Sequence, residues 1–286
     1  MSDGRADVAG GAGDIPTGTM DAGPAAGHVA GGVPGGAPGA GGRASSAAVT
    51  GRGRLRAPVF EMGLKGYTYG AEAVRLAVAA DRLAADLGVT IVFDPQHVDI
   101  PAVARETGHI LVFAQHMDPV TVGRGAGYVL PEALREAGAV GTLLNHAEHR
   151  LTLADIASTI RRAQELGMST VVCADSPEEA AAVAMLGPDV VLAEPPDLIA
   201  TDRSAATEIP WFVERAAELV RRVDPGILVM CGAGVRTPED AARMIRLGVD
   251  GTGSTSAILK ADDPIAAMTA MIEAVHAAWN ERTHAA

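Results

Sequence analysis

The stretch Val190-Val191-Leu192-Ala193-Glu194-Pro195-Pro196 joins an apolar run to a carboxylate and then to two prolines. A short apolar run with β-branched residues predicts a strand that is buried on both faces. Proline cannot donate to a strand ladder, so the chain must leave the sheet at this point. Glu194 therefore takes the last rigid position before a loop. A carboxylate there is either a catalytic base or a surface residue at a strand end.

Similar apolar runs recur along the chain, and each is followed by a longer stretch with helical periodicity. Thr152, Ser176 and Thr237 are suitable caps at the starts of helices, and glycines such as Gly88 and Gly138 stand at helix ends. The predicted strands are residues 59–64, 89–93, 110–114, 141–144, 169–173, 190–193, 227–231 and 249–253, and clear helical stretches are residues 71–87, 153–166, 209–223 and 238–247.

About eight strand–helix units in roughly 225 residues predict a closed, eight-stranded, parallel (β/α)8 barrel. The strands are apolar on both faces, as a parallel sheet covered by helices requires. A doubly wound open α/β sheet is the competing architecture. No Gly-x-Gly-x-x-Gly follows the first strand, which argues against the dinucleotide-binding version of that sheet.

Composition narrows the class of protein. The chain has 286 residues, of which 48% are hydrophobic, so a large core is possible. A net charge of -12 argues against nucleic acid or an anionic membrane as the main partner, and we expect neither. No apolar stretch approaches the roughly 18 residues of a membrane span. The only cysteines, Cys173 and Cys231, suit a reducing, cytoplasmic location better than a disulfide framework.

The first part of the chain differs in composition from the rest. Residues 1–56 are rich in glycine, alanine and proline, and residues 30–36 read Ala-Gly-Gly-Val-Pro-Gly-Gly. Such a segment cannot bury enough side chain to offset its ordering entropy. We expect a disordered tail or a start codon placed too early, without a signal peptide, followed by one barrel domain over residues 57–286.

Chemically useful residues gather where the predicted strands end. In a parallel barrel these ends meet on one face. A cation, an imidazole, a carboxylate and two glycine- or serine-rich loops there form a proton-transfer set beside an anion site made of backbone amides. The residues are Lys65 after the first strand, His146 and Glu148 after the fourth, Glu194 after the sixth, and residues 231–234 and 253–256 after the last two.

Longer motifs span these strand ends in a fixed order. They are residues 94–99 (Asp-Pro-Gln-His-Val-Asp), 114–119 (Ala-Gln-His-Met-Asp-Pro), 130–133 (Leu-Pro-Glu-Ala), 138–148 (Gly-Ala-Val-Gly-Thr-Leu-Leu-Asn-His-Ala-Glu), 194–199 (Glu-Pro-Pro-Asp-Leu-Ile) and 231–234 (Cys-Gly-Ala-Gly). With these motifs the sequence resembles the triosephosphate isomerase family, most closely its short archaeal type. The resemblance covers essentially all of residues 58–280 and implies the TIM-barrel fold.

The resemblance implies a role for each reactive group. Glu194 matches the base that moves a proton between adjacent carbons, and His146 matches the electrophile that polarises the carbonyl group. Lys65 matches the group that supplies positive charge to the enediolate. Glu148 matches a supporting carboxylate behind the site.

The resemblance also implies how the phosphate is held. Residues 195–201 match the hinge and start of a lid that closes on the phosphate. Ile199, Gly234, Thr255 and Ser256 fall at phosphate-contact positions, and Gly63 falls at a substrate-contact position. Amides near Gly234 and Ser256 suit a dianion.

The implied reaction interconverts dihydroxyacetone phosphate and D-glyceraldehyde 3-phosphate through an enediolate, as in glycolysis and gluconeogenesis. The implied enzyme uses no cofactor and no metal, and works in the cytoplasm as a homodimer or homotetramer.

The chain departs from the family pattern at several supporting positions. Gly63 replaces an asparagine, Ala147 a serine and Ala126 a threonine, Asp202 adds a charge to the lid, and residues 255–257 read Thr-Ser-Ala. Gly63 is expected to open room beside Lys65. These departures keep two alternatives open: a related isomerase for a tetrulose or pentulose phosphate, and a weakly catalytic protein that binds a phosphorylated metabolite.

Two further chemistries compete for the same residues. His97 and His116, each followed two residues later by an aspartate, invite a metal site, which needs three or four converging ligands. Lys65 invites imine formation, which needs a buried lysine inside a barrel strand. The resemblance accounts for both His-x-Asp stretches without a metal.

Overall fold

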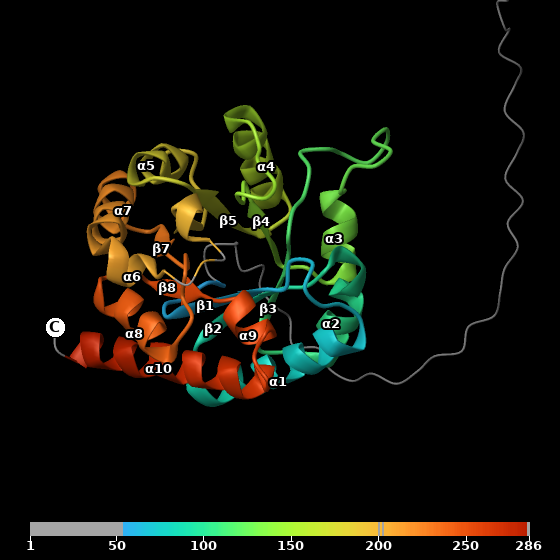
Figure 1. Cartoon of the computed structure of the whole chain (residues 1–286). Coiled ribbons are helices and arrows are strands. Elements are labelled where there is room, and N and C mark those ends of the chain that lie inside the picture. The colour runs from blue at the N-terminus through green and yellow to red at the C-terminus, as the bar shows by residue number, and fades with distance from the viewer. Residues whose placement is uncertain (1–53, 200, 202, 285–286) are drawn as a thin grey trace, which may run out of the picture. The chain divides into compact units, whose positions relative to one another are not determined.

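The computed structural model describes residues 54–199, 201 and 203–284 (Figure 1). Eight parallel strands close into a barrel in chain order, and β1 pairs with β8. The predicted closed barrel is confirmed, and the doubly wound alternative is wrong. The strands are β1 (Val59–Gly63), β2 (Thr90–Asp94), β3 (Leu111–Ala114), β4 (Gly141–Leu144), β5 (Ser169–Ala174), β6 (Val190–Ala193), β7 (Leu228–Met230) and β8 (Gly251–Gly253).

Helices alternate with the strands and surround them (Figure 1). None of the helices in the described residues is both long and apolar enough to cross a membrane. They are α1 (Ala71–Leu87), η2 (His97–Asp99), α2 (Ile100–Glu106), α3 (Pro131–Ala137), α4 (Leu153–Glu165), α5 (Pro177–Ala184), η3 (Pro196–Leu198), α6 (Ala205–Glu208), α7 (Pro210–Val223), α8 (Pro238–Arg246), α9 (Ser256–Leu259) and α10 (Pro264–His284).

The last two strands are shorter than the sequence predicts. β7 and β8 each keep three residues in the ladder, although residues 227–231 and 249–253 were expected. Ile227 and Val249 are fully buried just before their strands. Apolar character reports burial, not pairing, so an apolar run overestimates the length of a strand.

The predicted helix caps are in place. The side chains of Thr152 and Ser176 accept hydrogen bonds from backbone N–H groups in the first turns of α4 and α5. Thr237 and Asp240 form a reciprocal capping box at the start of α8. Gly88 and Gly138 end α1 and α3 in the left-handed conformation. The three hydroxyl caps thus start helices after the chain has left the barrel, and the two glycines stop helices where it must return.

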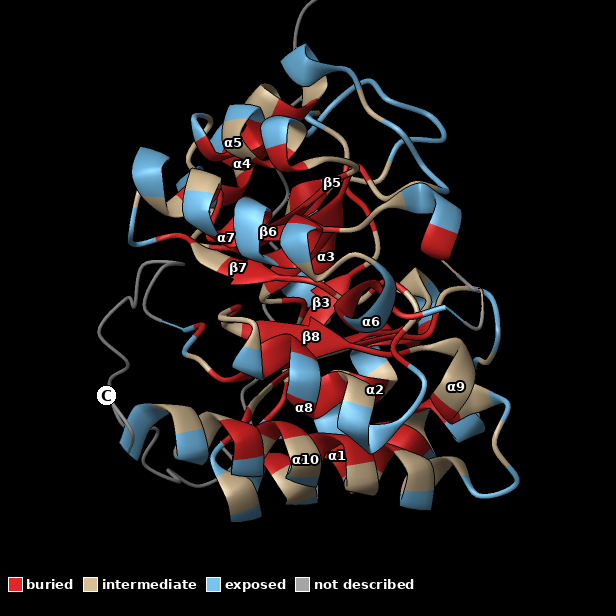
Figure 2. Ribbon diagram, turned by 60° about the vertical axis from the view of Figure 1, so that its left-hand side comes forward, coloured by how far each residue is buried: buried red, intermediate tan, exposed pale blue. Residues whose placement is uncertain are grey.

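The core has two layers (Figure 2). Phe60 and Met62 of β1 pack outward against the helices, whereas Val59 belongs to the cluster inside the barrel. Side chains alternate along a strand, so Glu61 and Gly63 also face the interior. The inner cluster is Leu55, Val59, Val92, Phe113, Leu143, Val171, Cys173, Val190, Leu192 and Met230.

Glycines make room for large neighbours inside the barrel. A Cβ atom placed on Gly141 would lie 2.3 Å from Cζ of the buried Phe113 ring. One placed on Gly251 would lie 2.8 Å from Cβ of Val59. The interior is therefore filled by pairing a bulky side chain with a glycine on a neighbouring strand.

The start of the barrel lies earlier than residue 57. Leu55 is buried in the inner cluster, and the Arg56 carbonyl accepts a hydrogen bond of 2.6 Å from the Thr90 hydroxyl. The expectation of a disordered tail over residues 1–56 falls almost entirely outside the described residues.

We expect Gly141→Ala to lower the free energy of unfolding by about 1–3 kcal/mol, because the new methyl group collides with the Phe113 ring. Urea denaturation followed by circular dichroism measures the loss. Gly108→Ala is the matched control, because a Cβ atom there meets nothing within 4 Å. Equal stability of the two variants would contradict this account of the barrel interior.

Candidate active site

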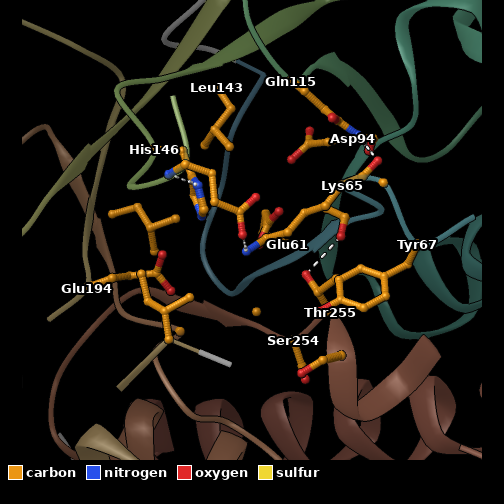
Figure 3. Close-up of a pocket in the computed structure, with 18 of the residues that line it drawn as sticks. Glu61, Lys65, Tyr67, Asp94, Gln115, Leu143, His146, Glu194, Ser254 and Thr255 are labelled. Carbon is orange, nitrogen blue, oxygen red and sulfur yellow. Dashed lines mark hydrogen bonds and ion pairs between the residues drawn. The ribbon is translucent and has the colours of Figure 1, made fainter. Parts of the chain in front are cut away.

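One pocket of about 340 Å³ opens at the carboxyl ends of the strands (Figure 3). The residues to which the sequence resemblance assigned a catalytic or a substrate-contact role line this pocket. These residues are Gly63, Lys65, His146, Glu148, Glu194, Ile199, Gly234, Thr255 and Ser256. They come from loops that follow five different strands, so only closure of the barrel brings them together.

Glu194 follows β6 and is anchored by its own backbone, because its N–H donates to the Ala174 carbonyl at 2.8 Å. A Cβ atom on Gly232 would lie 3.0 Å from Glu194 Oε1, so this glycine leaves space for the carboxyl group. Burial raises the pKa of Glu194 to about 7; the charge of Glu61 adds to the rise, and Lys65 opposes it. A base with a pKa near neutrality can both take up and return a proton.

His146 is held as a neutral imidazole. The backbone N–H of Glu148 donates to His146 Nδ1 at 3.1 Å, so Nδ1 carries a lone pair and the ring proton sits on Nε2. Burial lowers the pKa of His146 to about 4, and the neighbouring Lys65 charge lowers it further. Near neutral pH, His146 therefore offers an N–H donor and not a cation.

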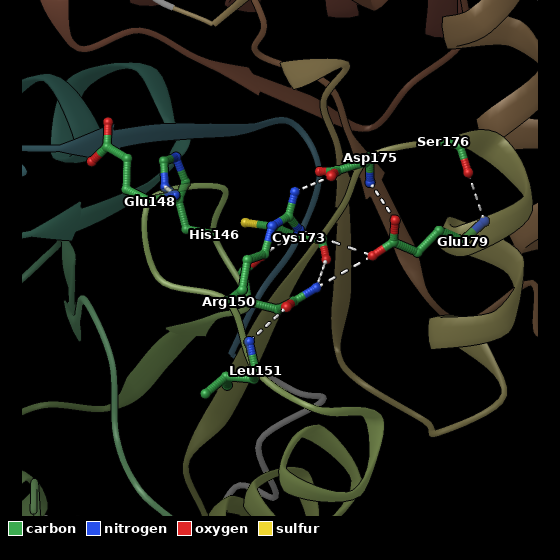
Figure 4. A network of polar contacts seen from close by, with 9 residues as sticks. His146, Glu148, Arg150, Leu151, Cys173, Asp175, Ser176 and Glu179 are labelled. Carbon is green, nitrogen blue, oxygen red and sulfur yellow. Dashed lines mark hydrogen bonds and ion pairs between the residues drawn. The ribbon is translucent and has the colours of Figure 1, made fainter. Parts of the chain in front are cut away.

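A polar network holds the loop that carries His146 (Figure 4). Asn145 adopts a left-handed conformation with φ of 58°. Its amide donates to the Cys173 carbonyl and accepts from the Leu151 N–H, both at 3.0 Å. Arg150 donates to the Asn145 carbonyl at 3.2 Å and forms an ion pair with Asp175. The loop after β4 is thereby tied to β5, which fixes the direction of the imidazole.

Lys65 also stands on a constrained backbone. Its φ of 47° is left-handed, and its carbonyl accepts hydrogen bonds from the side chains of Gln96 and Gln115. Lys65 Nζ lies 3.1 Å from Glu148 Oε1, and the Glu148 side chain is 62% exposed. Glu148 therefore stands at the rim beside Lys65, not behind the site. An ion pair this exposed contributes little stability and leaves Lys65 available.

The two glutamines are site residues that the sequence reasoning missed. Gln96 and Gln115 each follow a strand within a quoted motif, so their positions were visible in the sequence. Their target is a backbone carbonyl of another loop, which no sequence pattern reveals.

The side of the pocket formed by the segments after β7 and β8 is shaped by backbone contacts. A Cβ atom on Gly234 would lie 1.9 Å from the Arg203 carbonyl oxygen, so this glycine lets two loops touch. The Thr255 hydroxyl donates to the Gly63 carbonyl at 2.8 Å. Arg236 also lines the pocket and is a second cation that the sequence reasoning missed.

The predicted lid begins with a single 3-10 turn. Leu198 at the end of η3 is buried, and Ile199 is partly buried against the core. The Thr201 hydroxyl donates to the Leu198 carbonyl at 2.9 Å. The expected charge of Asp202 lies outside the described residues, as does Ala200.

Two acidic residues of the pocket were not anticipated. Glu61 interrupts the apolar run of β1, and Asp94 ends β2; both line the pocket. A Cβ atom on Gly63 would lie 2.5 Å from Glu61 Oε1. The expectation that Gly63 opens room beside Lys65 is therefore wrong, because the Glu61 carboxyl group fills that space.

The histidines near the pocket interact with one another. His116 stacks on His149 with ring centroids 4.1 Å apart, and His116 Nε2 lies 3.2 Å from Asp118. His97 Nε2 contacts the His116 carbonyl at 3.0 Å. Within the described part of the chain, no three His, Cys, Asp or Glu side chains are arranged to hold a metal ion.

The remaining departures from the family pattern lie away from the pocket lining. Ala126 is exposed in the loop between β3 and α3. Ala147, the residue after His146, is partly buried. Both cysteines are buried and free; Cys173 lies in β5, whereas Cys231 directly follows β7.

A base of near-neutral pKa, a neutral imidazole and an ammonium group at the mouth of a parallel (β/α)8 barrel define a proton-transferring enzyme. Comparison with known proteins agrees. The sequence profile "Triosephosphate isomerase" matches residues 62–275. The chain belongs to the triosephosphate isomerase family and is an isomerase.

Similar proteins come from archaea. The chain is 39% identical over 220 residues to the triosephosphate isomerase of Methanobacterium bryantii, which covers 76% of this chain and 97% of that protein. It is 39% identical to the triosephosphate isomerase of Methanoculleus marisnigri, over 76% of this chain and 99% of that protein. The resemblance to the archaeal type is confirmed.

We expect Glu194→Gln to be more stable than the unchanged protein at pH 8. The raised pKa of Glu194 means that the folded protein binds more protons than the unfolded chain between the ordinary carboxyl pKa and about 7. Stability is therefore lost as pH rises through this window, and glutamine removes the loss.

Thermal unfolding at pH 8 and pH 5 tests this expectation: the gain in Tm should shrink at the lower pH. Glu106→Gln, an exposed carboxylate on α2, is the control and should show no such pH dependence. A Glu194→Gln gain that is equal at both pH values would refute it.

Proposed function

We propose that this chain interconverts dihydroxyacetone phosphate and D-glyceraldehyde 3-phosphate, with residues 57–286 as the catalytic domain. The observation that carries the proposal is the convergence of Glu194, neutral His146 and Lys65 in one pocket. Each of the three supplies something that an enediolate mechanism needs: a carbon base, a hydrogen-bond donor and a positive charge.

In the proposed mechanism, the Glu194 carboxylate removes a proton from the carbon next to the carbonyl group. The C–H bond breaks, an O–H bond forms on Glu194, and the electron pair moves onto the carbonyl oxygen. The Nε2–H of His146 and the ammonium of Lys65 stabilise the negative charge on that oxygen. A proton then passes from the hydroxyl oxygen on the first carbon to this negatively charged oxygen, which becomes a hydroxyl group. Glu194 returns its proton to the neighbouring carbon as a C=O bond forms at the first carbon, which completes the isomerisation without a cofactor.

The phosphate group binds at the other end of the pocket in this proposal. Gly234 and Ser256 lie on loops whose backbone amides suit a dianion, and Ile199 belongs to the segment that covers it. Arg236 adds a positive charge at the rim. Thr255 contributes through its backbone, because its hydroxyl is already bonded to the Gly63 carbonyl.

The alternative of a larger sugar phosphate loses its main support. It rested on free space at Gly63, and the Glu61 carboxyl group occupies that space. The alternative of a protein that only binds a phosphorylated metabolite is also disfavoured. Such a protein would not need the Glu194 carboxylate, whose ionisation lowers the stability of the fold.

The assay that tests this function measures the interconversion of the two triose phosphates, with tetrulose and pentulose phosphates beside it. We expect the trioses to be preferred, and Glu194→Asp to lower kcat by orders of magnitude because the carboxylate is withdrawn from carbon. Circular dichroism should show that the variant is folded. Full activity of Glu194→Asp would eliminate Glu194 as the base.

We also propose that the protein works in the cytoplasm as a homodimer or homotetramer. Its two free, buried cysteines suit a reducing compartment. The loop between β3 and α3 exposes Val122 and Tyr128, which are 73% and 59% exposed, as a self-association surface would.

Static light scattering at micromolar concentration should therefore give a multiple of the chain mass. Val122→Asp combined with Tyr128→Ser should shift the protein toward the monomer by placing polar groups in the interface. A monomeric unchanged protein would refute self-association.

A further inference from the structure

Two carboxyl groups with no assigned role lie on the floor of the pocket. Glu61 faces the barrel interior from the middle of β1, and Asp94 does so from the end of β2. In the β1–β2 ladder Asp94 is paired with Gly63, two residues after Glu61 on the same face. The strands thus hold both groups next to each other and beside Lys65.

Glycines provide the space that these carboxyl groups occupy. A Cβ atom on Gly63 would lie 2.5 Å from Glu61 Oε1 and 3.6 Å from Asp94 Oδ2. A Cβ atom on Gly253 would lie 2.6 Å from Glu61 Oε2. Gly232 leaves space for Glu194 in the same way. Three carboxyl groups, those of Glu194, Glu61 and Asp94, therefore line the same pocket (Figure 3).

Asp94 needs a proton to be accommodated where it lies. It is fully buried, and neither of its oxygens meets a hydrogen-bond donor among the described residues. The Glu61 carboxyl group lies beside it, since both border the space at Gly63, and two neighbouring carboxyl groups with no donor between them cannot both stay charged. Burial, followed by the charge of Glu61, raises the pKa of Asp94 well above its ordinary value.

Glu61 is the better placed of the two to carry the negative charge. The neighbouring Asp94 carboxyl, the charge of Lys65 and the backbone of Gly63 each favour its ionised form. These contacts oppose the rise in the pKa of Glu61 that burial causes.

We propose that Asp94 and Glu61 share one proton, with Asp94 as the neutral acid and Glu61 as the carboxylate. We further propose that the charge of Glu61 is a positioning element for the reaction, because it keeps the Glu194 base from ionising at low pH. The second part rests on the proposed function, since it requires Glu194 to act as the base. Neither Glu61 nor Asp94 takes the substrate proton.

The charge on Glu61 can affect Glu194 because both line the same pocket on either side of Gly253. A Cβ atom on Gly232 would lie 3.0 Å from Glu194 Oε1 and 3.3 Å from the Gly253 carbonyl oxygen, and one on Gly253 would lie 2.6 Å from Glu61 Oε2. The effect of Glu61 is the largest of any charged group on Glu194. The thiols of Cys173 and Cys231 stay neutral, since burial raises their pKa values further. The other charged groups that face Glu194 are Lys65 after β1, Glu148 after β4 and Asp175 after β5.

The test compares the pH dependence of kcat/KM in Glu61→Gln and Asp94→Asn. Glu61→Gln removes the charge. The acid limb of the kcat/KM profile, where activity falls as pH falls, should therefore move to lower pH by roughly one unit. At one pH unit below the original midpoint, its rate relative to its own plateau should rise about fivefold. Asp94→Asn keeps an N–H donor to Glu61 and therefore its charge, so the acid limb should stay in place.

Controls separate this effect from a general disturbance. The phosphate of the substrate also titrates in this range, but identically for every variant, so differences between profiles report the protein. Glu106→Gln controls for loss of an exposed carboxylate, and Glu61→Asp should restore the original limb. An unmoved limb in Glu61→Gln, or an equal shift in Asp94→Asn, would overturn the role of Glu61.

Infrared difference spectroscopy tests the shared proton without any turnover. Glu194, with a pKa of about 7, contributes a carboxylic C=O band of its own near neutral pH, so the spectra are compared in a Glu194→Gln background. There the C=O band of a protonated Asp94 should be present at neutral pH and absent when Asp94→Asn is added. Absence of this band from Glu194→Gln alone would overturn the shared proton. An unchanged protein that does not turn over triose phosphates, together with the band in Glu194→Gln, would refute the proposed function and leave the carboxyl pair intact.

Discussion

Partial burial at the mouth of the barrel determines the charge of each catalytic group. Burial disfavours charge, so it raises the pKa of the Glu194 carboxyl and lowers the pKa of the His146 imidazole. The same physical effect therefore produces a base that ionises near neutrality and a neutral hydrogen-bond donor. Lys65 keeps access to water at the rim and pairs with an exposed carboxylate, so a positive charge remains for the substrate.

A second constraint is that the barrel interior must be filled. Parallel strands send alternate side chains to the axis, and at several positions a glycine provides the space that a large neighbouring group occupies. At the bottom of the barrel this constraint pairs Phe113 with Gly141. At the mouth it pairs Glu61 with Gly63 and Gly253, so the packing that closes the barrel also places acidic groups beside the active site.

Particular residues show which features of the fold and the site could be predicted from the sequence. The apolar runs and the helix caps at Thr152, Ser176 and Thr237 predicted the order of the elements, because periodicity and capping are local. The residues at the strand ends were also correctly gathered into one pocket. Gly63 was misinterpreted as free space, because the group that fills the space belongs to the residue two positions earlier. Gln96 and Gln115 escaped notice because they support the backbone of a different loop.

The sequence by itself determined that the chain alternates strands with helices and that Lys65, His146 and Glu194 end three of those strands. The periodicity of hydrophobic residues and the positions of prolines and glycines are sufficient to predict these features, since each of these signals depends on only a few neighbouring residues. Only the tertiary structure decided which face of each strand lines the barrel, which tautomer His146 adopts, and that Glu61 and Asp94 meet beside Glu194. These properties depend on desolvation and on contacts between strands far apart in the chain, and neither exists until the barrel closes.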